Sequence, residues 1–284
     1  MATWNLWWRF GPWRERAAAI RAVLLEARPD ICGLQEVWAD EGVNFAGELA
    51  AELGMGWAWS PSPFPERWQQ RAKEPAGEIG NAVLSRWPIA ETVELRLAPG
   101  DSGDSARTVL LAVVDAPDGR IPFATTQLTS APWDSASRSV QVRDLVDLLA
   151  AHDGHDYPVV LTGDLNAEPD SDEVRLLEGH RTPPAQPGFV LVDAWRYAKI
   201  DAIPWTWDRS NPYVAATMEP SARIDYVFVG LPRGGRGRVV SVRRLGHKPV
   251  QDLWPSDHAG LLVELGTAEA GGRPAHETPS NGAF

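Results

Sequence analysis

Apolar positions along the chain follow two periods, one typical of helices and one typical of strands. Helical spacing over 13–27 and 138–150 predicts two amphipathic helices, because Ile20, Val23 and Leu24 fall on one face of the first. Shorter helices are predicted at 44–53 and 171–177. Apolar or alternating runs predict strands at 2–8, 30–37, 80–86, 93–97, 107–114, 121–128, 190–195, 224–229, 239–242 and 260–265.

Both halves of the chain are therefore strand-rich, with helices between the strands. This order predicts an α/β fold in which two sheets pack together with helices outside, in one domain over 1–266. From Thr267 onward Gly, Pro, Ala and Glu dominate, and we expect 267–284 to be a disordered tail. The Pro-rich segment 57–78, which carries Arg67, Arg71 and Lys73, is long for a connection. A lid over a site and a plain surface loop explain it equally well.

One buried strand is predicted to end in polar residues suited to catalysis. The apolar run at 159–161 leads into Asp164 and Asn166, and extended geometry puts both side chains on the same side. A carboxylate beside a carboxamide suits the activation of water and the orientation of an anionic group. The alternative is an Asx turn, in which Asp and Asn side chains bond their own backbone.

Further polar residues stand at the ends of other predicted strands. If the two sheets face each other, these ends converge with Asp164 and Asn166 at one mouth. An oxygen-rich set with a single histidine and no cysteine is typical of Mg²⁺ or Mn²⁺ and not of zinc. The alternative for the histidine is a capping or core role. The additional residues are Asn5, Glu36, Asp225, Asp257 and His258.

Charge and composition narrow the classes of partner. A formal charge of −11 disfavours nucleic acid as a partner, because non-specific affinity for it comes from Lys and Arg contacts. The charge does not exclude a nuclease, since divalent cations held by acidic residues also meet phosphate. No apolar run is long enough to cross a bilayer, and no secretory signal begins the chain. We expect a soluble, cytoplasmic protein without stable membrane association, unless a signal was trimmed. Cys32, the one cysteine, is expected in the core.

Six segments in this order resemble the motifs of the endonuclease/exonuclease/phosphatase superfamily, over residues 3 to about 265. That superfamily includes pancreatic-type deoxyribonucleases, abasic-site endonucleases, neutral sphingomyelinases and inositol polyphosphate 5-phosphatases. The resemblance implies a four-layered α/β sandwich, with two packed mixed β-sheets and helices on both outer faces. The segments are Thr3-Trp4-Asn5-Leu6, Leu34-Gln35-Glu36-Val37, Gly80-Asn81-Ala82-Val83-Leu84-Ser85-Arg86, Gly163-Asp164-Leu165-Asn166, Arg223-Ile224-Asp225-Tyr226 and Ser256-Asp257-His258.

The resemblance also implies a reaction, the attack of water on a phosphoester with Mg²⁺ or Mn²⁺ as cofactor. Glu36 is the implied principal metal ligand, with Asn5 and Asp257 nearby. Asp164 is implied to orient or deprotonate the attacking water, and Asn166 to hold that water or a phosphate oxygen.

The same resemblance implies that a histidine binds the phosphoryl group. His258 is implied to bind it, with Asp225 fixing the tautomer of the ring from behind. Many members place a second histidine where this chain has Gln127. A glutamine can donate to a phosphate oxygen but carries no charge and transfers no proton. We therefore expect phosphate binding to depend less on pH than in a two-histidine relative.

Aromatic residues near these motifs are candidates for substrate contact. Trp7, Trp8 and Trp133 are predicted to form a rim that stacks on a base or packs on an apolar group, and Trp4 to fill the core. The alternative is that all of them fill the layer under the first strand. Arg107 is a further candidate for substrate binding.

Three functions fit these observations. The acidic balance favours a metal-dependent phosphodiesterase or phosphatase acting on a small molecule. A DNA or RNA nuclease is the alternative within the same chemistry. A non-catalytic binding module on the same scaffold is the alternative from another class, and the intact set of polar strand ends disfavours it.

Overall fold

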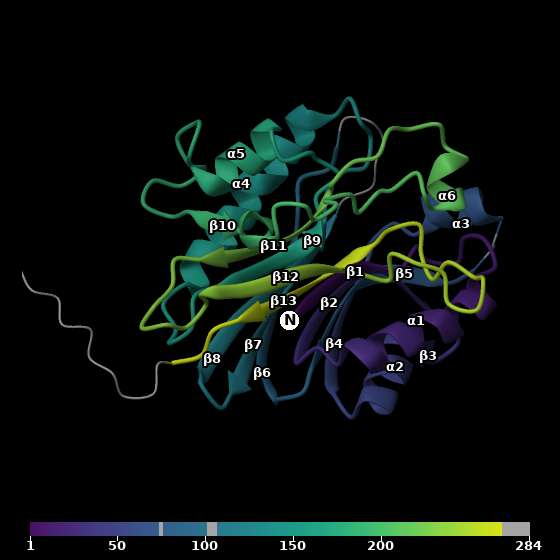
Figure 1. Cartoon of the computed structure of the whole chain (residues 1–284), viewed down its shortest axis with the longest axis horizontal. Coiled ribbons are helices and arrows are strands. Elements are labelled where there is room, and N and C mark those ends of the chain that lie inside the picture. Colours follow the sequence, from purple (N-terminus) through teal and green to yellow (C-terminus); the bar gives the residue numbers. More distant parts are fainter. Residues whose placement is uncertain (74–75, 101–106, 269–284) are drawn as a thin grey trace, which may run out of the picture.

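Two β-sheets lie face to face in the computed structural model, which describes residues 1–73, 76–100 and 107–268 (Figure 1). The first sheet has the strand order β12-β13-β1-β2-β5-β4, and β3 pairs with β2 outside this path. Its strands are β1 (Ala2–Asn5), β2 (Ile31–Asp40), β3 (Val43–Asn44), β4 (Gly56–Pro61), β5 (Glu78–Ser85), β12 (Val239–Leu245) and β13 (Gly260–Leu265).

The second sheet has the order β10-β11-β9-β8-β7-β6. In each sheet one pair of neighbours is parallel, β1 with β2 and β8 with β9, and the other described pairs are antiparallel. Both sheets are therefore mixed. The strands of the second sheet are β6 (Ile89–Arg96), β7 (Thr108–Ala116), β8 (Gly119–Gln127), β9 (Val160–Asp164), β10 (Leu191–Asp193) and β11 (Asp225–Gly230).

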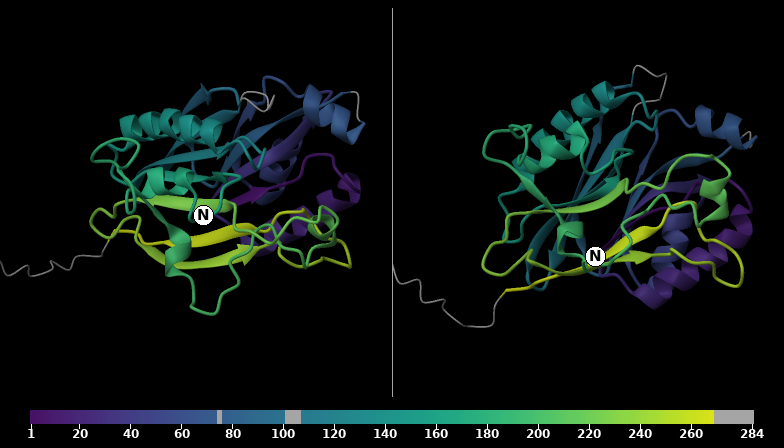
Figure 2. Two further views of the ribbon diagram at one scale, coloured as in Figure 1. Left: turned by 90° about the horizontal axis from the view of Figure 1, so that it is seen from above. Right: turned by 45° about the horizontal axis from the view of Figure 1, so that its top comes forward.

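Helices cover the outer face of each sheet (Figures 1 and 2). α1 (Trp13–Ala27) and α2 (Phe45–Leu53) pack on the first sheet, and α4 (Ser135–His152) and α5 (Asp172–Glu178) on the second. Three short helices lie in connections: α3 (Glu66–Ala72), the 3₁₀ helix η1 (Ala194–Tyr197) and α6 (Pro212–Ala215). The four layers confirm the predicted fold class.

Local sequence explains where the first two helices begin and end. Asn44 caps α2, since its side-chain oxygen accepts the backbone N–H of Ala46 at 2.9 Å. Gly54 ends the same helix in the left-handed conformation that glycine adopts without strain. α1 ends at Ala27, and its C-cap residue Arg28 lies directly before Pro29, whose ring disfavours a helical residue in front of it.

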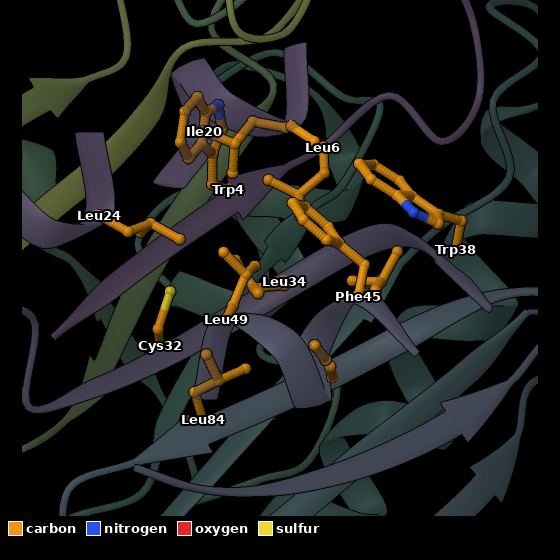
Figure 3. Packing of buried hydrophobic residues seen from close by; sticks show 14 of the residues in the cluster. Trp4, Leu6, Ile20, Leu24, Cys32, Leu34, Trp38, Phe45, Leu49 and Leu84 are labelled. Carbon is orange, nitrogen blue, oxygen red and sulfur yellow. The ribbon is translucent and has the colours of Figure 1, made fainter. Parts of the chain in front are cut away.

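The layer between α1, α2 and the first sheet is the aromatic core of the protein. Figure 3 shows Trp4 and Cys32 within it, surrounded by leucine and isoleucine side chains. The ring of Trp38 stacks on Phe45 with centroids 3.9 Å apart. The predictions that Cys32 and Trp4 fill the core are therefore confirmed.

The two sheets lie close together at Gly33 of β2. A Cβ added at Gly33 would lie 2.3 Å from Oγ1 of Thr162 in the opposite sheet, so this position requires glycine. Next to it, Gln35 donates to Oγ1 of Thr125 at 2.8 Å across the gap. This buried hydrogen bond fixes how β2 sits over β8, and thus how the strand ends meet.

Two predictions about secondary structure were wrong. The first strand ends at Asn5 and not at Trp8, because Trp7 and Trp8 adopt left-handed φ values of 57° and 30°. The segment 57–78 is not an irregular loop, since it contains most of β4 and all of α3. β4 is an edge strand, where a proline such as Pro61 removes no ladder hydrogen bond that the sheet needs.

Two further predictions concern membranes and the tail. Among the described helices, none combines the length and the apolar character needed to span a bilayer. The predicted disordered tail falls, from residue 269 onward, outside the described residues.

Candidate active site

Three strands of the second sheet present polar side chains in register. β9 ends at Asp164, which pairs directly with Asp225 of β11 on one side and with Gln127 of β8 on the other. Because neighbouring strands lie about 4.8 Å apart, the register alone brings these three side chains together. They stand at one edge of the sheet.

The first sheet contributes Asn5 and Glu36 to the same place. β1 and β2 are parallel, so their carboxyl ends lie at one edge, with Asn5 opposite Gln35. The pairing of β2 with β5 is irregular between Leu34 and Val37, and Glu36 there has a φ of 50°. Such an irregularity re-aims a side chain, and the Glu36 carboxylate lines the cavity at this edge.

Asp257 and His258 arrive from the segment that precedes β13. The hydroxyl of Ser256 donates to the backbone carbonyl of Asn5 at 2.7 Å, which ties this segment to the end of β1. β13 runs antiparallel to β1, so its start lies beside the end of that strand. The first sheet thereby places a carboxylate and an imidazole opposite Asp164.

Arg16 of α1 ties the segment that follows β1 to the segment that carries Asp257. It is fully buried, and its guanidinium donates to five backbone carbonyls of the described residues. Burial lowers its pKa to about 10, which leaves it charged at neutral pH. The carbonyls belong to Leu6, Trp7, Trp8, Phe10 and Pro255, at 2.8 to 3.2 Å.

Asp164 is the most connected of the carboxylates. Its Oδ2 accepts from the side-chain amides of Asn5 at 3.0 Å and Gln127 at 3.1 Å. Its Oδ1 accepts the backbone N–H of Asn166 at 3.0 Å. Burial raises its pKa, as does Asp225, while His258 and the hydrogen bonds from Gln127 and Asn166 act in the opposite direction. Three donors fix the orientation of this carboxylate.

His258 lies between two of these carboxylates. Its Nδ1 lies 2.9 Å from Oδ2 of Asp225, and its Nε2 lies 4.0 Å from Oδ2 of Asp164. Burial alone would lower its pKa, but Asp225, Asp164 and Asp257 raise it well above the ordinary value. These carboxylates favour the protonated form of the ring, in which Nδ1–H donates to Asp225 and Nε2–H is left on the side of Asp164. Asp225, His258 and Asp164 thus form a row of three buried side chains, which we call the buried line.

Glu36 and Asp257 are two carboxylates of the site that could hold a cation. Oε1 of Glu36 accepts from Gln127 at 2.7 Å, and Oδ1 of Asp257 accepts from Ser256 at 3.3 Å. The second oxygen of each makes no hydrogen bond with a described residue. Burial raises the pKa of Asp257 to about 7, and the charge of Glu36 adds to this rise. The carboxylate oxygens of these two residues are donors of the kind that fits Mg²⁺ or Mn²⁺.

A second group of ligand atoms, from Asp164, Asp225 and His258, lies within 4.8 Å of one another. This group fits a metal less well, because the Asp225–His258 hydrogen bond already uses Nδ1 of the ring. An imidazolium also has no lone pair to give to a metal. Glu36 and Asp257, which line the same cavity, are other carboxylates that could hold a cation.

Asn166 reaches the site by a turn and not by strand alternation. Its φ of 49° is left-handed, and its backbone N–H closes an Asx turn on Asp164. The expectation of extended geometry was wrong here. Its side-chain amide donates to the carbonyl of Leu128 at 3.1 Å, and the residue still lines the cavity. The Asx turn and a place in the site are thus compatible.

These groups open into a cavity of about 350 Å³. Of the predicted substrate-binding residues, Gln127, Arg107, Trp7 and Trp133 line it, and Trp133 is 82% exposed. Trp8 is fully buried, and its indole N–H donates to the carbonyl of Glu78 at 2.9 Å. The prediction that Trp8 belongs to the rim was therefore wrong.

Three residues at the cavity were not identified as contact candidates from the sequence. Trp207 packs edge-on against His258 with ring centroids 5.1 Å apart. Trp68, on α3, and Phe10 line one wall of the cavity. Trp68 belongs to the segment 57–78, whose prolines predicted a loop and not a helix. Trp207 lies in a segment without strand or helix periodicity. Only their aromatic character was available as a signal.

A larger cavity of about 410 Å³ lies at the opposite end of the sandwich. It is lined mainly by apolar residues around Met1, Trp87 and Tyr157. None of the polar strand-end residues borders it.

Comparison with known proteins agrees with this geometry. A sequence profile of the Endonuclease/Exonuclease/phosphatase family matches residues 2–258. A search of curated protein sequences finds no match to this chain.

Solved structures share the fold at low sequence identity. An endonuclease/exonuclease/phosphatase from Beutenbergia cavernae is 24% identical with a TM-score of 0.66, over 94% of this chain and 71% of the other. Truncated Caenorhabditis elegans TDP2 is 19% identical with a TM-score of 0.67, over 92% and 94%. The human Nocturnin catalytic domain with bound sulfate is 18% identical with a TM-score of 0.66, over 93% and 94%. Because the profile match spans nearly the whole chain, this protein belongs to the endonuclease/exonuclease/phosphatase family.

Proposed function

We propose that this protein hydrolyses a phosphoester of a small molecule with the help of Mg²⁺ or Mn²⁺. Members of its family are in general metal-dependent phosphoester hydrolases. The observation that carries the proposal is the buried line Asp225, His258, Asp164, which faces Glu36 and Asp257 in one cavity. That combination supplies a cation-binding group, an orienting carboxylate and a positive donor within reach of one phosphate.

Glu36 and Asp257 would hold the divalent cation, with the Asn5 side chain close by. When bound there, the cation would supply positive charge that polarises the phosphate and stabilises the leaving oxygen. The Asn5 amide also donates to Asp164, so the same residue orients the carboxylate next to the cation.

The attacking water is assigned to Asp164. Its carboxylate is held by Asn5, Gln127 and the backbone of Asn166, so its orientation does not change when a substrate arrives. Burial raises its pKa toward the range of a useful general base. Asn166, which lies next to this carboxylate and lines the cavity, would hold the water or a phosphate oxygen.

The phosphoryl group is assigned to His258. Its Nε2–H is the only imidazolium donor among the described residues that line the cavity, and Asp225 orients the ring from the other side. A cation fixed in this way stabilises negative charge that develops on the phosphoryl oxygens without moving. Trp207, packed edge-on against the ring, limits its rotation.

A small-molecule substrate is favoured by the size of the cavity and by the charge of the protein. A volume of about 350 Å³ fits a compact ligand. The net charge of −11 works against a long polyanion. A nuclease is the second candidate, because exposed Trp133 and half-buried Trp7 at the cavity could stack on a base.

The test is hydrolysis of a generic phosphodiester, a phosphomonoester and plasmid DNA, with and without Mg²⁺ or Mn²⁺. Glu36→Gln and His258→Ala are each expected to lower kcat/KM by about 100-fold or more. Glu91→Gln and His180→Ala change exposed residues outside the cavity and serve as controls. If folded, metal-loaded protein cleaves none of the three substrates, a non-catalytic binding module becomes the better description. Faster cleavage of plasmid DNA than of the small esters would favour the nuclease.

A further inference from the structure

One wall of the active-site cavity is cationic although its floor is acidic. Arg67, Trp68 and Arg71 lie on α3 and all line the cavity, together with Arg107 at the foot of β7. The floor carries Glu36, Asp164 and Asp257. In a chain with a net charge of −11, the two arginines of α3, Arg67 and Arg71, place positive charge on this wall of the cavity.

Aromatic rings lie under two of these arginines. The guanidinium of Arg71 lies 5.3 Å from the centroid of Phe10, and that of Arg107 lies 4.9 Å from Trp68. The Phe10 ring is in turn 6.0 Å from Trp7. The arginines are thus supported on an apolar surface that continues to the β1 end of the site.

Arg71 and Arg107 differ in the contacts that they make. Arg107 donates to Oε1 of Gln127 at 2.5 Å, and this amide contacts Glu36, so Arg107 belongs to the floor. Arg71 makes no ion pair with a carboxylate of the described residues, and its one described contact is the Phe10 ring. Its charge is therefore exposed at the cavity wall and is not neutralised by the groups around it.

We propose that Arg67 and Arg71 bind a second phosphate of the substrate, beyond the phosphoester that is cleaved. Guanidinium groups bind phosphate through paired N–H donors, and α3 presents two of them one turn apart. The intervening Trp7, Phe10 and Trp68 surface suits a flat or apolar group between the two phosphates. This assignment rests on the proposed function, and it makes the substrate a small molecule with two phosphates.

The helix that carries these arginines is held in place by Trp68 and Gln69. Trp68 is only 4% exposed and packs in the aromatic core. The side chain of Gln69 donates to the carbonyl of Gly77 at 2.9 Å, which ties the helix to the strand that follows. Substitution of Arg71, which is exposed, therefore leaves α3 in place.

The test is calorimetric binding of two matched ligands to the full chain with Ca²⁺ present. Thymidine 5′-phosphate has one phosphate, and thymidine 3′,5′-bisphosphate adds a second on the same framework. The wild type is expected to bind the bisphosphate about tenfold more tightly, which equals one charge-assisted contact. The double variant R67Q/R71Q, and R71Q to a smaller extent, are expected to lose this preference. R71K is expected to keep part of it, and the control R143Q, on the exposed face of α4, to keep all of it.

Equal affinity of the wild type for the two ligands would overturn the proposal, as would an unchanged preference in R67Q/R71Q. A thymidine oligonucleotide that binds more than about tenfold tighter than the bisphosphate would also overturn it, in favour of a polynucleotide. Hydrolysis of the para-nitrophenyl ester of thymidine 5′-phosphate is measured separately. That reaction tests the proposed hydrolase, so loss of activity and loss of the binding preference are distinguished.

Discussion

The side-chain amide of Gln127 donates to Oε1 of Glu36 at 2.7 Å and so joins the two sheets at the floor of the cavity. The same nitrogen donates to Asp164 at 3.1 Å, and the carbonyl end of the amide accepts from Arg107. Both ends of Gln127 are therefore occupied. Gln127 thereby holds Glu36 and Asp164 at a fixed distance from each other. It also links both carboxylates to the positively charged Arg107.

Replacing Gln127 with histidine is expected to add an ionisation to the pH profile of kcat/KM. An imidazole at this position gains a proton below about pH 6.5, so phosphate binding should strengthen and KM should fall on the acidic side. The measurement is kcat/KM and KM across pH 5 to 9 for Q127H. Q127N, which shortens the side chain without adding a titrating group, is the control. An unchanged profile and KM in Q127H would contradict the idea that glutamine makes phosphate binding less dependent on pH.

Sequence periodicity predicted the long elements well because their burial follows a simple pattern. α1 runs over Trp13–Ala27, as its apolar spacing indicated, and strand ends with polar residues do meet at one edge. The family motifs supplied the same residues by resemblance. Periodicity and the family motifs both predict a residue's position correctly where that position follows from the helix or strand that carries the residue.

The parts that the sequence did not predict depend on backbone conformations without periodicity. Alternation fails after Asn5, because left-handed residues follow, and so Trp7 faces the cavity while Trp8 is buried in the core. Glu36 reaches the site through an irregular strand pairing, not through strand alternation. Prolines suggested a loop where the edge strand β4 and the helix α3 lie, since an edge strand and a helix start both tolerate proline.

Asp225→Asn is expected to shift the pH dependence of activity toward lower pH. Asp225 is one of three carboxylates that raise the pKa of His258 against the effect of burial. Without that charge the imidazolium loses its proton at a lower pH, so the alkaline limb of the kcat/KM profile moves down. We also expect a loss of about 100-fold in kcat at neutral pH. Asp147→Asn, on the exposed face of α4, is the control. An alkaline limb that stays in place in D225N would exclude Asp225 as the partner that sets the charge of His258.

Arg16→Met is expected to destabilise the protein severely. The substitution leaves buried carbonyls of Leu6, Trp8 and Pro255 without a donor, at an expected cost of about 3 kcal/mol or more. The melting temperature should fall by roughly 6 °C or more. Arg14→Met, two residues earlier in the same helix and exposed, is the control and should change stability by less than about 0.5 kcal/mol. Similar melting temperatures for the two variants would mean that Arg16 does not hold the β1 end and the Asp257 segment together.

Trp133→Ala is expected to raise KM by about fivefold while kcat changes little. Trp133 is 82% exposed at the edge of the cavity, so it can contact a substrate but supports no core. Loss of one stacking contact corresponds to roughly 1 kcal/mol or more. Trp57→Ala removes another exposed tryptophan outside the cavity and is the control. If KM rises equally in both variants, the rim assignment of Trp133 is wrong.

Asp257→Asn is expected to stabilise the metal-free protein at alkaline pH. Burial raises the folded-state pKa of Asp257 to about 7, with Glu36 and Asp164 adding to the rise and His258 and Arg16 opposing it. An unfolded aspartate has a pKa of about 4, so the folded protein holds this proton more tightly. Its contribution to stability is therefore full below about pH 4, falls as pH rises toward 7 and is lost above it. With EDTA at pH 8, the variant should melt roughly 3 °C or more above the wild type, and the gap should narrow at pH 5.

A bound cation should reverse this difference, because it neutralises the charge that Asp257 carries at high pH. Mg²⁺ or Mn²⁺ is expected to raise the melting temperature of the wild type more at pH 8 than at pH 5, and that of D257N little at either pH. Asp147→Asn should behave as the wild type does. The measurement is the melting temperature of all three proteins with metal and with EDTA. A cation that stabilises D257N as strongly as the wild type would place the metal away from Asp257.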